Sequence, residues 1–162
     1  MPSAFASQHP PLPPPLRPGS GDARARKVAD FYESLSPATL PRLYQIYANN
    51  ARFIDPFNDV TGAEAIHGIF KHMFAALQAP RFSVVSSLTE GDQCVLLWNF
   101  DARRSGKGVH IHGASHLRFD AQGRVAWHRD YWDPAREIYE ALPLLGGLLR
   151  WLRRQLASRP VL

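Results

Sequence analysis

The sequence contains one cysteine, two methionines and no long hydrophobic run. The single cysteine, Cys94, excludes an intramolecular disulfide and a thiolate metal cluster, and its place in an apolar stretch indicates a reducing compartment. No stretch approaches the ~18 apolar residues that a membrane helix needs. The N-terminus has no continuous apolar segment after a basic start, so no secretory signal is apparent. We therefore expect a cytoplasmic protein, and we expect neither a cofactor nor a bound metal.

Acidic residues are outnumbered, and the net charge of the 162 residues is +5. The excess is concentrated at the two ends, in residues 1–27 and in residues 141–162, where four arginines have no acidic partner. The middle of the chain is slightly acidic. Because binding to phosphate requires a basic surface on the folded domain, this distribution argues against a nucleic-acid partner.

The terminal segments differ from the middle of the chain in composition. Seven of the 14 prolines fall within the first 18 residues, so residues 1–22 are predicted to be a disordered Pro-rich tail, with recognition by an SH3-like groove as the alternative. Residues 23–140 form the predicted domain. Residues 141–162 combine leucines with arginines and are predicted to be a basic amphipathic helix that contacts an anionic membrane or packs on the domain.

Helical patterns come first within the domain. Apolar residues recur at helical spacing over 28–35 and again over 40–47, and a short β-like stretch at 52–54 ends at Asp55-Pro56. Thr61 and Glu64 have the spacing of a capping box, which predicts a helix that ends before Pro80.

From Arg81 to Asp133 the pattern changes to short β-rich runs separated by turn residues near Gly91, Gly106 and Gly123. This pattern predicts four antiparallel strands. Helices followed by an antiparallel sheet indicate an α+β fold in which the helices cover one face of the sheet.

The order of these elements and several local motifs resemble the nuclear transport factor 2-like superfamily, which includes ketosteroid isomerases and SnoaL-type polyketide cyclases. The resemblance covers about residues 26–140, and its motifs lie at 47–56, Gly62, 117–120, 123–125 and 130–133. It implies a cone-shaped, curved sheet whose helices enclose an apolar pocket, a small hydrophobic molecule as ligand and a homodimer.

The resemblance also implies roles for particular residues. In the isomerase branch the general base corresponds to Asp55, and the tyrosine that polarises the substrate carbonyl corresponds to Tyr32. The branch's second donor, a protonated aspartate, is replaced by Ser115, and serine is a weaker donor. In the SnoaL-like branch the acid/base residue corresponds to Asp130. The sequence therefore combines features of two branches.

Residues two apart on a strand share a face, so inward positions can be predicted together. If Ser115 points inward, its strand and both neighbours present a wall of mostly aromatic residues with a histidine and an aspartate. On its own strand the inward residues are then Ile111, Gly113 and Leu117, and on the neighbouring strands the resemblance implies that Trp98, Phe100, Ala102, His128, Asp130 and Trp132 point inward. Trp98, Phe100, Ser115, Trp132 and Tyr47 are the predicted ligand-binding residues, and Asp55, Tyr32, Asp130 and His128 are the predicted catalytic residues.

Each candidate also has a purely structural interpretation. Asp55 fits an Asp-Pro turn in which the carboxylate caps a neighbouring backbone amide. His128 and Asp130 fit a buried ion pair as well as an acid/base couple, and Tyr32 fits a core position. His110, His112 and His116 share a strand face with the spacing of metal ligands, but an outward face toward solvent or a partner subunit is the preferred interpretation.

Three functions are compatible with these features. The first is an enzyme such as an isomerase or cyclase that moves a proton on a hydrophobic carbonyl compound, using Asp55 or Asp130. The second is a carrier or sensor that only binds a ligand, and the third is an interaction or dimerisation module. Ser115 favours binding, whereas Asp55, His128 and Asp130 favour chemistry.

Overall fold

The computed structural model describes residues 21–134 and confirms an α+β fold. The segments predicted as a Pro-rich tail and as a basic C-terminal helix lie, apart from residues 21 and 22, outside the described residues. The elements in chain order are α1 (Ala23–Glu33), the 3-10 turn η1 (Leu40–Arg42), α2 (Leu43–Ile46), β1 (Tyr47–Ile54), β2 (Asp59–Thr61), α3 (Ala63–Ala76), β3 (Gln78–Glu90), β4 (Gln93–Arg104), β5 (Lys107–Phe119) and β6 (Val125–Tyr131).

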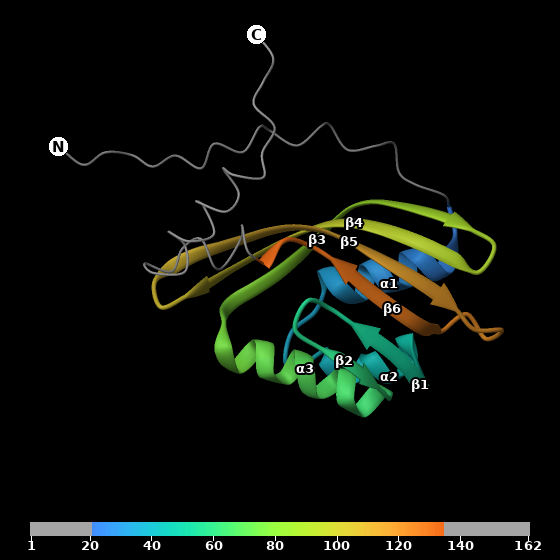
Figure 1. The fold of residues 1–162 in the computed structure, drawn as a ribbon, viewed down its shortest axis with the longest axis horizontal. Helices are drawn as coiled ribbons and strands as arrows, with labels where there is room; N and C mark the ends of the chain where they lie inside the picture. Colours follow the sequence, from blue (N-terminus) through green and yellow to red (C-terminus); the bar gives the residue numbers. More distant parts are fainter. Residues whose placement is uncertain (1–20, 135–162) are drawn as a thin grey trace, which may run out of the picture.

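The six strands form one open mixed sheet in the order β2-β1-β6-β5-β4-β3. The four long strands predicted after the helices pair antiparallel, and β1 adds to β6 in parallel. Figure 1 shows the long strands curving over the helices, which lie together on one side of the sheet. The inner face of the sheet is therefore enclosed, as the resemblance implied.

Helix α1 is fixed at its N-terminus by Asp22. The Asp22 carboxylate accepts hydrogen bonds from the backbone amides of Arg24 and Ala25 and pairs with the Arg24 guanidinium at 2.8 Å. The hydrogen bond from Arg24 lowers the pKa of Asp22 to about 2. This capped helix buries Val28, Phe31 and Tyr32 and so points Tyr32 into the core.

Tyr47 begins a strand, which corrects the prediction that it continues the second helix. Helix α2 ends at Ile46, and Tyr47 adopts an extended conformation and pairs with Val125 of β6. The predicted β-like stretch at 52–54 is the end of this longer strand β1. The helical spacing gave the wrong element for Tyr47 because a tyrosine fits a buried strand as well as a helix.

The predicted capping box at Thr61 and Glu64 is not formed. Thr61 belongs to β2, the residue before α3 is Gly62 at a φ of 107°, and no side chain caps that end of the helix. The Glu64 carboxylate instead accepts a hydrogen bond from the Tyr44 hydroxyl. At the other end of the connection, β3 begins earlier than predicted and includes Pro80, which is tolerated because β3 is an edge strand.

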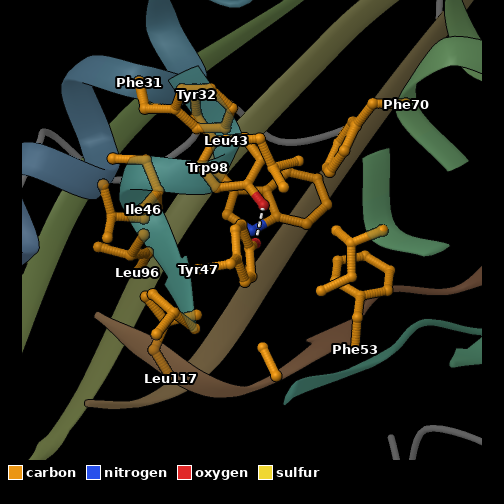
Figure 2. Packing of buried hydrophobic residues seen from close by; sticks show 14 of the residues in the cluster. Phe31, Tyr32, Leu43, Ile46, Tyr47, Phe53, Phe70, Leu96, Trp98 and Leu117 are labelled. Atoms are coloured by element: carbon orange, nitrogen blue, oxygen red, sulfur yellow. Dashed lines mark hydrogen bonds between the residues drawn. The ribbon is translucent and has the colours of Figure 1, made fainter. Parts of the chain in front are cut away.

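The core lies between the helices and the inner face of the sheet. Its residues come from every layer and include Phe31, Leu43, Ile46, Phe53, Ile66, Phe70, Leu96, Leu117 and Val125. Figure 2 shows Tyr32 and Tyr47 in the middle of this cluster. Within the described part of the chain, no helix is long and apolar enough to span a membrane.

Candidate functional site

Three neighbouring strands bring the predicted polar residues together on the inner face of the sheet. Ser115 on β5 lies opposite Asp130 on β6, and Leu117 lies opposite His128. Ser115, Trp98 and His128 are buried, as strand alternation and the resemblance together predicted. The predicted inward face is therefore confirmed for these three residues.

A buried chain of hydrogen bonds links helix α1 to β6. The Tyr32 and Tyr47 hydroxyl oxygens are 2.5 Å apart, and the Tyr47 hydroxyl is 2.6 Å from Nδ1 of His128. The Tyr47 and His128 rings are stacked at a centroid distance of 5.9 Å, and the Phe53 ring lies 4.7 Å from the imidazole. The imidazole is thus held in one orientation from several sides.

The chain continues to Asp130, where a second chain joins it. Nε2 of His128 is 2.7 Å from Oδ1 of Asp130, and the Ser115 hydroxyl donates to the same oxygen at 2.5 Å. The Trp98 indole N–H donates to Ser115 Oγ at 2.8 Å. Two series of buried side chains therefore converge on a single carboxylate oxygen.

With Asp130 ionised and the His128 imidazole neutral, the chemistry of the donors gives these bonds one direction. An indole N–H can only donate, so Ser115 accepts a hydrogen bond from Trp98 and donates one to Asp130. With Asp130 ionised, His128 donates from Nε2. In the neutral imidazole Nδ1 then accepts from Tyr47, and Tyr47 accepts from Tyr32. In this protonation state every proton of the network points toward Asp130.

Burial keeps the two tyrosines protonated. Desolvation raises the pKa of Tyr32 well above its usual value, and the nearby charges of Tyr47 and Asp130 add to the shift. Desolvation also raises the pKa of Tyr47. Both hydroxyls therefore remain available as donors throughout the neutral range.

Two cavities meet at Asp130. The interior cavity has a volume of about 10 Å³, the room that one water molecule needs, and is lined by Tyr32, Phe82, Val84, Leu96, Trp98, Ser115 and Asp130. A cavity of this volume is too small for an organic ligand, so the apolar ligand pocket between the helices and the sheet stays a prediction. The second cavity opens to solvent, has a volume of about 260 Å³ and is lined by Ile54, Asp55, Pro56, Arg129, Asp130, Tyr131 and Trp132.

The predicted role of Asp55 as a pocket base required it to lie among Trp98 and Phe100, and it does not lie there. It lines the open cavity with Trp132, and its carboxylate oxygens accept hydrogen bonds from the backbone amides of Phe57 and Asn58 and from the Asn58 side chain at 2.7–3.0 Å. This is the Asp-Pro turn that the sequence offered as the alternative. The short turn pulls the carboxylate back onto its own backbone.

The three histidines of β5 point outward, as preferred from the sequence. His110 pairs with Asp101 at 2.5 Å, an acidic neighbour across the strands that the sequence did not reveal. His112 and His116 lie within 2.9 Å of side-chain oxygens of Asn99 and Gln93. Among residues 21–134, no group of three or more histidine, cysteine or acidic side chains is arranged to hold a metal ion.

The remaining ligand-binding candidates, Phe100 and Trp132, lie in different parts of the structure. Phe100 is buried against Phe82 and lines neither of the two cavities, whereas Trp132 lines the open cavity and contacts the Phe57 ring. Arg129 in the wall of that cavity was missed. Its only signal in the sequence was its position next to Asp130, because a single surface arginine has no distinguishing pattern.

The fold of this chain is similar to that of several solved structures. The chain is similar to the structure of an NTF2-like protein of unknown function from Burkholderia pseudomallei K96243, with 18% identity, 71% of this chain and 94% of that chain covered, and a TM-score of 0.64. It is similar to a protein with a ketosteroid isomerase-like fold from Catenulispora acidiphila DSM 44928 in complex with trimethylamine, with 16% identity, 72% and 89% covered, and a TM-score of 0.62.

A third similar structure is called a SnoaL-like polyketide cyclase, from Jannaschia sp. CCS1, with 17% identity, 68% and 83% covered, and a TM-score of 0.59. These low identities establish the fold alone. No curated protein sequence matches the chain. A family model described as the SnoaL-like domain matches residues 28–128, and the chain therefore belongs to the SnoaL-like family.

Proposed function

We propose that this protein is an acid/base enzyme of the isomerase or cyclase type, which moves a proton on a small hydrophobic carbonyl compound with Asp130 as the catalytic residue. The observation that carries the proposal is the convergence of both hydrogen-bond chains on Oδ1 of Asp130. The names of related structures, which include a polyketide cyclase and an isomerase, agree with this chemistry.

The geometry of the Asp130 carboxylate suits a base. Oδ1 accepts from His128 and Ser115, whereas no residue in 21–134 donates to Oδ2. The side chain is 16% exposed and borders the open cavity. In the proposed step Oδ2 takes a proton from the carbon next to the carbonyl group, the C–H electron pair forms the enolate, and Asp130 later returns the proton to the product.

The other polar residues act through Asp130 in this proposal. His128 and Ser115 hold the carboxylate in one orientation, and Tyr32 and Tyr47 fix the imidazole with Nε2–H toward it. Tyr32 is then a positioning residue, because its proton is donated to Tyr47 and is not available to a substrate carbonyl. This role differs from the one that the isomerase resemblance implied.

Exchange of the α-protons of 1-indanone in D2O, followed by NMR, tests the proposal without knowledge of the natural substrate. We expect the wild type to accelerate exchange and Asp130→Asn to remove about 10²–10⁴ of that acceleration. Asp55→Asn is the matched control and should keep most of the rate, since its carboxylate is engaged in a turn. Equal rates in wild type and Asp130→Asn, or no acceleration over buffer, would refute the proposal.

A second candidate role, homodimerisation, is favoured by the outer face of the sheet. Leu88 and Val95 are exposed there, and Leu88 has 59% of its surface accessible. All described helices pack on the opposite side, so we propose that a second copy covers this face. A monomeric mass in sedimentation of the full chain would contradict this role.

A further inference from the structure

The open cavity lies in a notch at the edge of β6. The last parallel pair between β1 and β6 joins Ile54 to Arg129, after which β1 ends and β6 continues to Tyr131. Past this pair β6 has no neighbour on its β1 side. A ligand in the notch can therefore reach side chains from both faces of the strand, including Asp130 and its sequence neighbour Arg129.

Arg129 is the only cation in the described wall of this cavity, and its donors are not engaged. Its guanidinium carbon lies 5.1 Å from the centre of the Tyr131 ring, which orients the side chain. Within residues 21–134 it forms neither a hydrogen bond nor a salt bridge. A guanidinium held flat by an aromatic ring and with free donors is suited to bind a carboxylate through two parallel hydrogen bonds.

The carboxylates around Arg129 accept hydrogen bonds from other residues. Asp59 is close enough for Arg129 to contribute to lowering its pKa, but the larger effect comes from Arg52, which binds both Asp59 oxygens at 2.9 and 2.8 Å. Asp55 accepts the bonds of its own turn. Oδ1 of Asp130 accepts from His128 and Ser115. Within residues 21–134, Arg129 is therefore left without a bound anion.

We propose that Arg129 is an anion subsite and that the ligand of the open cavity is a small organic acid. Its carboxylate binds Arg129, and its apolar part packs against Trp132, Pro56 and Ile54. The further statement that this acid is the substrate, with an acidic C–H directed to Oδ2 of Asp130, rests on the proposed function. The cavity volume of about 260 Å³ suits a compound smaller than most drug-sized ligands.

The test compares two probes of nearly the same shape, 3-oxoindane-1-carboxylate and its methyl ester, by chemical-shift titration of the 15N-labelled protein. We expect the carboxylate to bind more tightly than the ester and to shift the Trp132 indole resonance. Arg129→Gln should weaken carboxylate binding by about tenfold or more and leave ester binding unchanged. Arg118→Gln, which removes an outer-face arginine paired with Asp92, is the matched control and should change neither.

Asp130→Asn separates this inference from the proposed function. It should bind the carboxylate at least as tightly as the wild type, because it removes a neighbouring negative charge, even though proton exchange is lost. Equal binding of both probes, no binding of either, or no effect of Arg129→Gln would overturn the anion subsite and leave the role of Asp130 intact. Carboxylate binding through Arg129 with unchanged exchange in Asp130→Asn would uphold the subsite and refute the proposed chemistry.

Discussion

Tyr47 is the residue on which the buried network depends most. It accepts from Tyr32 and donates to His128, and it is completely buried at the first position of β1. A residue in the middle of such a chain has a partner on each side, so its removal leaves two groups without one. Tyr32 is the first residue of the hydrogen-bond chain, so its removal leaves only the Tyr47 hydroxyl oxygen without a donor.

Tyr47→Phe should therefore destabilise the protein by about 1–3 kcal/mol, because a buried Tyr32 hydroxyl is left without an acceptor. Tyr32→Phe should cost less, since an under-satisfied acceptor is cheaper than an orphaned donor. Tyr44→Phe, which removes the surface hydroxyl bonded to Glu64, is the control and should change little. Urea unfolding of the three variants at pH 7 gives the order, and a larger loss for Tyr32→Phe than for Tyr47→Phe would contradict the assigned direction of the chain.

Because of the same two tyrosines, we expect the protein to lose stability at alkaline pH. Their pKa values are raised in the folded state by burial, so the folded protein holds protons that the unfolded chain releases. This contribution is complete below about pH 10 and is lost as the pH rises above it, by about 1.4 kcal/mol per pH unit for each tyrosine. Unfolding of Tyr47→Phe should depend less steeply on pH above 10, and an unchanged slope would contradict burial of an intact hydroxyl.

At the scale of the element, strand β5 can hold Trp98 close to Ser115 because residue 113 of this strand is a glycine. A Cβ on Gly113 would lie 2.3–2.8 Å from three atoms of the Trp98 ring. The indole thus lies directly on the β5 backbone, and this contact places its N–H at Ser115. The second hydrogen-bond chain depends on this close approach.

Gly113→Ala should displace Trp98 and destabilise the protein by about 1–3 kcal/mol, as expected for overpacking. Gly108→Ala on the same strand is the control, because the added Cβ would meet only the exposed His110 ring, which can move. Urea unfolding and tryptophan fluorescence report both effects. An unperturbed fluorescence spectrum and full stability in Gly113→Ala would show that Trp98 is not held by this contact.

The sequence predicted the elements where local chemistry decides them. The turns at Gly91, Gly106 and Gly123 each have positive φ and separate the strands as expected. The predictions for the start of β1 and for the N-terminus of α3 were wrong. Tyr47 follows a helical spacing, and Thr61 and Glu64 match a capping motif by chance. In both cases pairing in the sheet overrode the local signal.

At the scale of the whole molecule, strand alternation and the family resemblance together were enough to predict that Trp98, Ser115, His128 and Asp130 share the inner face. It could not predict that they bond to one another, because that depends on side-chain rotamers. Nor could it reveal the bond between Tyr47 and His128, which are 81 residues apart and belong to strands that pair in parallel only in the folded sheet. Asp55 was misplaced because the resemblance gave a position in the chain and not the direction of its side chain.

The central claim is that every donor in the buried network points toward Asp130, and the tautomer of His128 tests it most directly. The measurement is 15N NMR of histidine-labelled protein at about pH 9, where imidazoles are neutral, with the signals of His128 identified by their loss in His128→Asn. The claim predicts that Nε2 carries the proton and that Nδ1 is unprotonated and accepts from Tyr47. A proton on Nδ1 would contradict it, because His128 could then no longer donate to Asp130 and the chain would run the other way.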